Sequence, residues 1–302
     1  MRKKGRNYII LIMIFIVGDS FTFTLREDSS MAKLMTEQVG IAYGDHHVVR
    51  DLDLDIPENQ ITTIIGPNGC GKSTILKALA RIHSVQEGSI YLDGKAIKKE
   101  STKEIAKKMG VLPQTPKAPS GLTVSELVSY GRYPHQKGFG KLSDHDREVI
   151  QWALEITGVE EFSNRSIDAL SGGQRQRVWI AMALAQETEL LILDEPTTYL
   201  DLAHQLEVLK LLEQLNREEG RTIVMVIHDL NHAARFADYI VALRGGKVIR
   251  EGTPEEVIRK DVLKEVFQID AEVVQDPRTN RPICLTYDLL GSVPEVCQKA
   301  VL

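Results

Sequence analysis

The chain has 302 residues, of which 43% are hydrophobic and 26% are charged, so it is long enough to bury a substantial core. Its formal net charge of −5 gives no sign of the basic footprint that nucleic-acid binding normally requires, and no nucleic-acid partner is expected. The three cysteines, Cys70, Cys284 and Cys297, lie too far apart for a disulfide framework or for paired zinc ligands. Composition therefore predicts a globular enzyme with reduced thiols.

Residues 1–30 form an N-terminal extension with a basic start and an apolar run over residues 8–17. The run resembles the core of a signal peptide, but no small-x-small cleavage site follows it, and it is too short to span a bilayer as a helix. We favour translation from Met31, with residues 1–30 as upstream sequence. A membrane tether is the alternative, and mass spectrometry of the native N-terminus would separate the two.

Short apolar strands alternate with amphipathic helices from Met35 onward. Apolar residues alternate with aspartates over residues 52–56, which predicts a half-buried strand. The β-branched run Ile61–Ile65 predicts a buried strand that enters a loop. Helical spacing follows at residues 75–79, and Asp93-Gly94 predicts a hairpin turn.

Residues 116 to about 187 contain no convincing strand, so we predict a helical insert there. Thr123 and Glu126 match a helix capping box, and residues 149–156 form one apolar stripe. Strand signals return at residues 190–193, 221–227 and 239–243, with a helix between each pair. The alternation predicts an α/β fold with a largely parallel sheet, which places ligands at the carboxyl ends of its strands.

A phosphate-binding loop follows the strand Ile61–Ile65. Its fixed positions in the pattern G-x-x-x-x-G-K-[ST] are Gly66, Gly71, Lys72 and Ser73. Glycines let backbone N–H groups point at phosphate oxygens, and the next helix adds its positive N-terminal end. We expect Lys72 to contact the β- and γ-phosphates of ATP and Ser73 to bind Mg²⁺. The loop does not indicate what the bound nucleotide is used for, because kinases, GTPases and helicases carry it too.

Two further segments distinguish among the classes of protein that carry this loop. Leu190–Leu193 is an apolar strand that ends in Asp194 and Glu195, where Asp194 would hold Mg²⁺ and Glu195 would orient or deprotonate water. Ser171 begins a helix with unobstructed N–H groups, which makes a second anion site about a hundred residues from the first. A head-to-tail pair of chains, each clamping one nucleotide between two loops, accommodates both sites.

With these motifs the chain resembles the ATP-binding subunit of an ABC transporter over about residues 34–288. The resemblance implies a P-loop NTPase core with a parallel-rich sheet, an antiparallel N-terminal β-subdomain and a helical subdomain at about 116–187. It places the ATPase domain at residues 31–302, with a C-terminal segment at about 254–302. It also implies two integral-membrane permease subunits, an indirect substrate-binding protein partner, and a peripheral location on the cytoplasmic face of the membrane.

Several site residues rest on the resemblance alone. Gln114 matches a glutamine that contacts Mg²⁺ and water, His228 a histidine on the γ-phosphate, and Tyr43 an aromatic on adenine. Asp201 matches an aspartate that crosses the dimer interface. The nucleotide ligands implied within one copy are Tyr43, Gly66, Pro67, Asn68, Gly69, Cys70, Gly71, Lys72, Ser73 and Thr74. Those implied from the second copy are Ser171, Gly172, Gly173, Gln174 and Asp201.

The cargo is inferred from a finer likeness. The segments 129–135, 197–201 and 281–285 look like those of ATPases in bacterial iron–siderophore importers. We therefore expect ferric-siderophore uptake, with haem or cobalamin as the alternative cargo. A soluble ABC ATPase would usually carry two cores or a long coiled coil, and a small-molecule phosphotransferase would not need the Ser171 loop.

Overall fold

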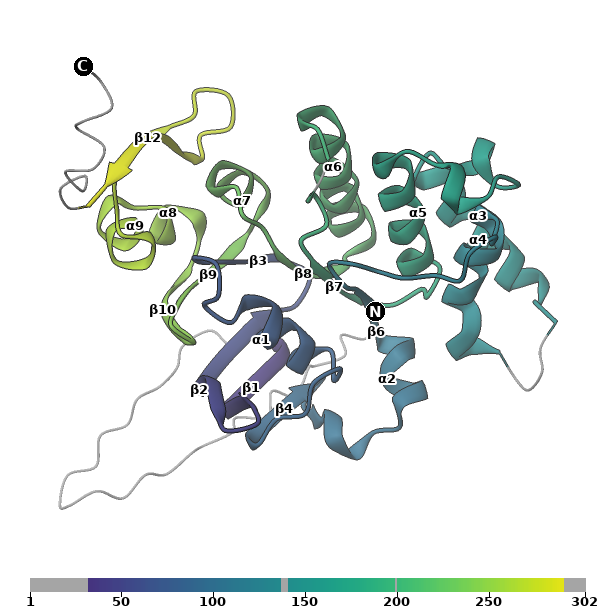
Figure 1. Cartoon of the computed structure of the whole chain (residues 1–302), viewed down its shortest axis with the longest axis horizontal. Coiled ribbons are helices and arrows are strands. Elements are labelled where there is room, and N and C mark those ends of the chain that lie inside the picture. The colour runs from purple at the N-terminus through teal and green to yellow at the C-terminus, as the bar shows by residue number, and fades with distance from the viewer. Residues whose placement is uncertain (1–31, 137–140, 199, 291–302) are drawn as a thin grey trace, which may run out of the picture. The chain divides into compact units, whose positions relative to one another are not determined.

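The computed structural model describes residues 32–136, 141–198 and 200–290 (Figure 1). The chain divides into two units, Met1–Ser30 and Met31–Leu302, and the described residues all belong to the second. The predictions made for residues 1–30 and for Cys297 lie outside the described residues.

A six-stranded sheet in the order β10-β9-β3-β8-β7-β6 forms the central layer. All neighbouring strands are parallel except β10 and β9, which confirms the predicted parallel-rich sheet. Its strands are β3 (Ile61–Ile65), β6 (Met109–Leu112), β7 (Leu190–Asp194), β8 (Thr222–Val226), β9 (Tyr239–Arg244) and β10 (Lys247–Gly252). Sequence patterning located β3, β7, β8 and β9 but missed the short β6 and the edge strand β10.

The two faces of this sheet pack into two different cores, because successive side chains of a strand point to opposite faces. In β7, Leu190 and Ile192 join one core, while Leu191 and Leu193 join the other. Figure 1 shows α1 and the strands β1, β2 and β4 on one side of the sheet and the helices α5, α6 and α7 on the other. The continuous apolar runs in the sequence reflect this burial on both faces.

A four-stranded antiparallel sheet, in the order β2-β1-β4-β5, covers one face. Its strands are β1 (Ala32–Tyr43), β2 (His46–Pro57), β4 (Glu87–Leu92) and β5 (Lys95–Ala96). Asp93 and Gly94 join β4 to β5 with φ angles of 50° and 72°, which confirms the predicted hairpin turn. A two-stranded hairpin near the C-terminus, β11 (Ile269–Gln275) with β12 (Pro282–Leu289), was not predicted.

The α-helices pack on the parallel sheet and form the insert beside it, where α3 and α4 pack against α5. They are α1 (Lys72–Leu79), α2 (Thr102–Lys108), α3 (Val124–Ser129), α4 (Asp144–Ile156), α5 (Gly172–Leu184), α6 (Leu202–Glu219), α7 (Leu230–Phe236), α8 (Pro254–Val257) and α9 (Lys260–Phe267). The described part of residues 116–187 contains no strand, only an isolated bridge between Thr123 and Ser166. The capping box of Thr123 and Glu126 is confirmed. No described helix has both the length and the apolar surface needed to cross a bilayer.

A buried arginine joins the helices of this insert. Arg132 is 1% exposed, and its Nε donates to Asp146 Oδ1 at 2.8 Å. Its Nη1 donates to Ala185 O at 2.9 Å and to Glu187 Oε2 at 3.0 Å. Burial alone would raise the pKa of Asp146, but hydrogen bonds from Ser143 and Arg132 lower it to about 2. Ionised Asp146 therefore stabilises the fold at neutral pH, and this contribution is lost as the pH falls from about 4 towards about 2.

We predict that Arg132→Met lowers the free energy of unfolding by about 3 kcal/mol, because it leaves a buried carboxylate without its partner. Urea unfolding followed by circular dichroism measures the change. Arg147→Met is the matched control, since that side chain is 63% exposed and lies 3.7 Å from Asp144. We expect about 0.5 kcal/mol or less for the control, and an equal effect in both variants would contradict the role of Arg132.

Candidate nucleotide-binding site

Four neighbouring strands of the parallel sheet end level with one another. Ile64 of β3 lies beside Val226 of β8, and Asp194 of β7 lies beside the same Val226. β6 runs parallel to β7 on its other side. In sheet order, the segments that leave these ends carry Gly66, His228, Glu195 and Gln114. The sheet therefore gathers residues from four distant parts of the sequence at one edge.

The loop between β3 and α1 is shaped by its glycines. Gly66 has a φ of 153°, and a Cβ there would lie 2.3 Å from the carbonyl oxygen of Leu243 and 2.8 Å from Cys70 Sγ. Gly71 has a φ of 105° and is the residue that caps α1, without a side-chain hydrogen bond. The first N–H groups of α1 have no side-chain cap, as an anion site requires.

A cavity of about 300 Å³ lies against this loop. It is lined by Val48, Asn68, Gly69, Gly71, Lys72, Ser73, Thr74, Glu195 and His228. Of the predicted loop residues, Gly66, Pro67 and Cys70 are not among those that line it. Cys70 is buried, and burial raises the pKa of its thiol, which argues against a reactive cysteine.

The polar side chains at the phosphate loop and the end of β7 are fixed by hydrogen bonds. Lys72 is 6% exposed, and its Nζ donates to the carbonyl oxygens of Gly66 at 2.8 Å and Pro67 at 3.0 Å. Ser73 Oγ donates to Asp194 Oδ1 at 3.0 Å. Burial raises the pKa of Asp194, against the effect of the Ser73 hydrogen bond.

This donor set fits Mg²⁺. The Ser73 hydroxyl and the Asp194 carboxylate, which are in contact, are hard oxygen donors of the kind that magnesium takes together with phosphate oxygens. Gln114, whose amide nitrogen donates to the adjacent Glu195, has an amide oxygen of the same kind. A buried carboxylate whose pKa is raised also gains from a cation beside it. Among the residues that the structure describes, no cluster of three His, Cys, Asp or Glu side chains offers an alternative metal site.

Glu195 lies at the centre of a hydrogen-bond cage. Its Oε1 lies 2.6 Å from His228 Nε2, and its Oε2 accepts from Gln114 Nε2 at 2.7 Å and from Thr198 Oγ1 at 2.9 Å. Burial would raise the pKa of Glu195, but these hydrogen bonds hold it below its usual value. Its φ of 55° is a left-handed conformation that non-glycine residues rarely adopt. The carboxylate is therefore ionised and fixed in direction at neutral pH.

The remaining predicted residues lie outside the cavity lining. Ser171 caps α5, where its Oγ accepts from Gln174 N at 3.3 Å, and both Ser171 and Gly172 are exposed. Asp201 caps α6. Tyr43 ends β1, 47% exposed, with its ring centroid 4.5 Å from that of His83. None of these residues lines the cavity of its own chain.

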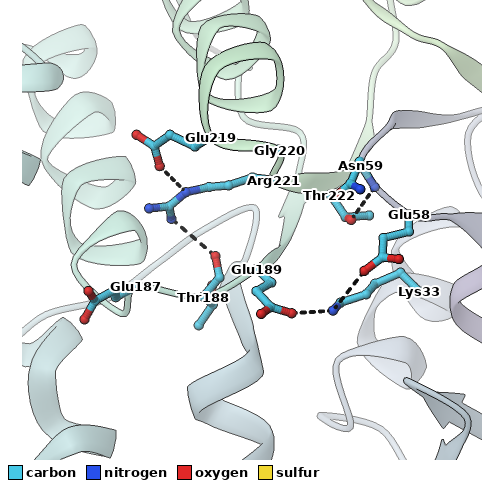
Figure 2. Close-up of a pocket in the computed structure, with 10 residues that line it drawn as sticks. All are labelled: Lys33, Glu58, Asn59, Glu187, Thr188, Glu189, Glu219, Gly220, Arg221 and Thr222. Carbon is cyan, nitrogen blue, oxygen red and sulfur yellow. Dashed lines mark hydrogen bonds and ion pairs between the residues drawn. The ribbon is translucent and has the colours of Figure 1, made fainter. Parts of the chain in front are cut away.

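A second hollow, of about 390 Å³, lies at the amino ends of β7 and β8 (Figure 2). In Figure 2, Lys33 points between Glu58 and Glu189, and Arg221 pairs with Glu219. Burial alone would lower the pKa of Lys33, but hydrogen bonds to Asp93 and Glu189 raise it. These ion pairs tie β1 to the segment before β7, so this hollow has a structural explanation and stands apart from the loop cavity.

The ABC transporter family model matches residues 49–198, which include the loop and Glu195. The iron(3+)-hydroxamate import ATP-binding protein FhuC of Bacillus subtilis is 68% identical over 266 residues, or 88% of this chain and 99% of FhuC. The chain belongs to the ABC transporter family. Within that family, the ferric enterobactin transport ATP-binding protein FepC of Escherichia coli is 44% identical over 84% of this chain and 94% of FepC.

Solved structures of the ABC family have the same fold. The dimeric structure of the bacterial ABC transporter cassette MJ0796 matches with a TM-score of 0.66 at 32% identity, over 73% of this chain and 98% of the cassette. Family members bind ATP, which confirms the expected nucleotide class. The same cassette was solved in a post-hydrolysis state with ADP and Pi.

Sequence reasoning missed two residues of this ABC site. Thr198 donates to Glu195, and its signal was its place three residues after that carboxylate. Val48 lines the cavity from β2 and had no signal, because an apolar strand residue is ordinarily part of a core.

We predict that Gly66→Ala weakens ATP binding about tenfold or more, because the new Cβ must displace the backbone of Leu243. Gly94→Ala is the control: its φ of 72° is also positive, but nothing lies within 4 Å of the added Cβ. Titration with a fluorescent ATP analogue measures both variants. Wild-type affinity in Gly66→Ala would show that the close approach of these backbones is not required.

Proposed function

We propose that this chain is the ATP-hydrolysing subunit of an ABC importer and couples ATP binding and hydrolysis to the uptake of a ferric siderophore. The observation that carries the enzymatic part is the cage around Glu195, beside Asp194 and the phosphate loop. The cargo is supported by 68% identity to a subunit named for iron(3+)-hydroxamate import. We therefore take a ferric hydroxamate as the first candidate cargo.

The triphosphate of ATP would occupy the loop cavity. Backbone N–H groups of residues 66–74 and the start of α1 would bind its oxygens, with Lys72 on the β- and γ-phosphates. Ser73, Asp194 and Gln114 would hold Mg²⁺, which when bound neutralises charge on the β- and γ-phosphate oxygens. Tyr43 would stack on the adenine.

Hydrolysis depends on the direction of the Glu195 carboxylate. The ionised carboxylate would accept a hydrogen bond from water and orient its oxygen towards the γ-phosphorus. A bond from that oxygen to phosphorus forms, the bond to the bridging oxygen of ADP breaks, and Glu195 takes the proton. His228, 2.6 Å from Glu195, would donate to the γ-phosphate. Orientation of the reacting groups and stabilisation of charge contribute most to the rate of phosphoryl transfer.

Two copies would complete two sites. The segment Ser171–Gln174, whose first two residues are exposed, and Asp201 of one copy would close over the nucleotide held by the phosphate loop of the other, around a two-fold axis. ATP would draw the copies together, and hydrolysis would release them.

Closure would act on two integral-membrane permease subunits, from a position on the cytoplasmic face of the membrane. The segment Tyr130–His135 would contact the permease, since Tyr130 and Tyr133 are 51% and 77% exposed while Arg132 anchors the segment from within. A substrate-binding protein would deliver the cargo on the other side.

We predict that Glu195→Gln keeps ATP affinity within about twofold, lowers hydrolysis about a hundredfold or more, and traps a dimer with MgATP. The amide retains the shape of the side chain but cannot take a proton. Phosphate release and size-exclusion chromatography with light scattering measure the two effects. Glu161→Gln, an exposed position, is the control. Wild-type turnover in Glu195→Gln would remove Glu195 as the base.

Cargo is tested by transport. We predict that this chain, expressed in a bacterium that lacks its own hydroxamate-import ATPase, restores uptake of radioactive iron supplied as a ferric hydroxamate, and that the Glu195→Gln variant does not. Haem and cobalamin supplied to the same cells test the alternative cargoes. Restored uptake of one of these, without hydroxamate uptake, would replace the siderophore assignment.

A further inference from the structure

His204, in the first turn of α6, touches two segments that are distant in sequence. Its Nδ1 lies 2.8 Å from Asp201 Oδ1, and its backbone N donates to the same oxygen at 3.0 Å. Its ring also lies over Gly173, where an added Cβ would be 3.3 Å from His204 Cδ2 and 3.4 Å from Cγ. One side chain therefore links the start of α6 to the start of α5.

Both linked segments are exposed on the same chain. Ser171 and Gly172 are exposed beside Gly173, and the Asp201 side chain is 67% exposed. Leu202, next to Asp201, is 73% exposed. Ser171, Gly172 and Asp201 are therefore accessible to a second copy of this chain.

The contact of His204 with Asp201 orients the carboxylate. Because Asp201 carries a negative charge, Nδ1 is assigned as the donor, and Oδ1 then accepts two hydrogen bonds from one residue. The backbone hydrogen bond, followed by the side-chain one, holds the pKa of Asp201 below its usual value.

Other contacts between these regions use different atoms. Gln176 Nε2 donates to Pro196 O at 2.9 Å, and Gln205 Nε2 donates to Leu200 O at 2.8 Å. Arg177 Nη1 lies 3.7 Å from Glu207 Oε2. The first two hydrogen bonds tie α5 and α6 each to the segment between β7 and α6, and the Arg177–Glu207 pair joins the two helices directly. Loss of His204 would therefore leave the helices packed while freeing Gly173 and Asp201 to move separately.

We propose that His204 is a positioning residue for assembly: it fixes the Ser171–Gln174 segment and Asp201 as one rigid surface that receives the nucleotide of a second copy of this chain. The inference rests on the proposed ATP-bound dimer and adds to it the residue that makes its two exposed segments act together. A histidine that merely supports the Asp201 cap of α6 would stabilise the helix and leave association unchanged.

The test uses the full chain with Glu195→Gln as the background, because that variant accumulates the ATP-bound dimer. Analytical ultracentrifugation with MgATP gives the dimer dissociation constant, and a fluorescent ATP analogue at low protein concentration gives the affinity of the monomer. We expect His204→Ala to raise the dimer dissociation constant about tenfold or more while monomer affinity and Tm stay near the background values. His145→Ala is the control, since His145 is 61% exposed on α4.

A double-mutant cycle tests whether His204 acts on the dimer through Asp201. Asp201→Ala should weaken the dimer, and His204→Ala added to it should have about twofold further effect or less, because both changes remove one interaction. Full multiplication of the two effects, or a dimer constant unchanged in His204→Ala, overturns the inference. If the Glu195→Gln background itself forms no dimer, the proposed two-copy site fails and the inference fails with it.

Discussion

Hydrogen bonding between β3, β8, β7 and β6 in parallel register brings four strand ends to one edge of the sheet, and the site depends on that alignment. A shift of one residue in any strand would turn its side chains to the opposite face. Such a shift is opposed by both cores at once, since alternate residues of β7 are buried on opposite faces. The apolar interior therefore fixes the positions of charged groups that lie just beyond it.

The same burial creates an electrostatic conflict at Asp194 and Glu195. Desolvation disfavours the charge on each, and their charges oppose one another. The structure resolves the conflict differently for the two neighbours. Glu195 is held ionised by donors from three segments, whereas Asp194 has the hydroxyl of Ser73 and a raised pKa. A cation beside Asp194 would offset the remaining cost of its buried negative charge. A magnesium-bound nucleotide therefore suits Asp194 and Glu195 better than a nucleotide without the metal.

Much of this arrangement could be predicted from the sequence, because its signals are local. The phosphate loop, the strand ending in Asp194 and the cap at Ser171 each combine a motif with a periodic segment beside it. The contacts that join them could not be predicted. Nothing in the local sequence indicates that Gln114 donates to Glu195, or that Arg132 is buried with Asp146, since both contacts depend on how separate elements pack. β6 was missed because four residues are too few to show a period.

The two halves of the proposed site are built by different means. The phosphate-loop half rests on the core: Lys72, Asp194 and Glu195 are each 9% exposed or less. The half that faces the partner copy rests on helix caps in exposed segments. Ser171 Oγ accepts from Gln174 N, and a hydroxyl that accepts this bond keeps its own hydrogen to donate to a phosphate oxygen. Exposed segments are displaced at lower cost than a core, so the partner-facing half can move as one surface in response to nucleotide while the loop that binds the nucleotide stays fixed.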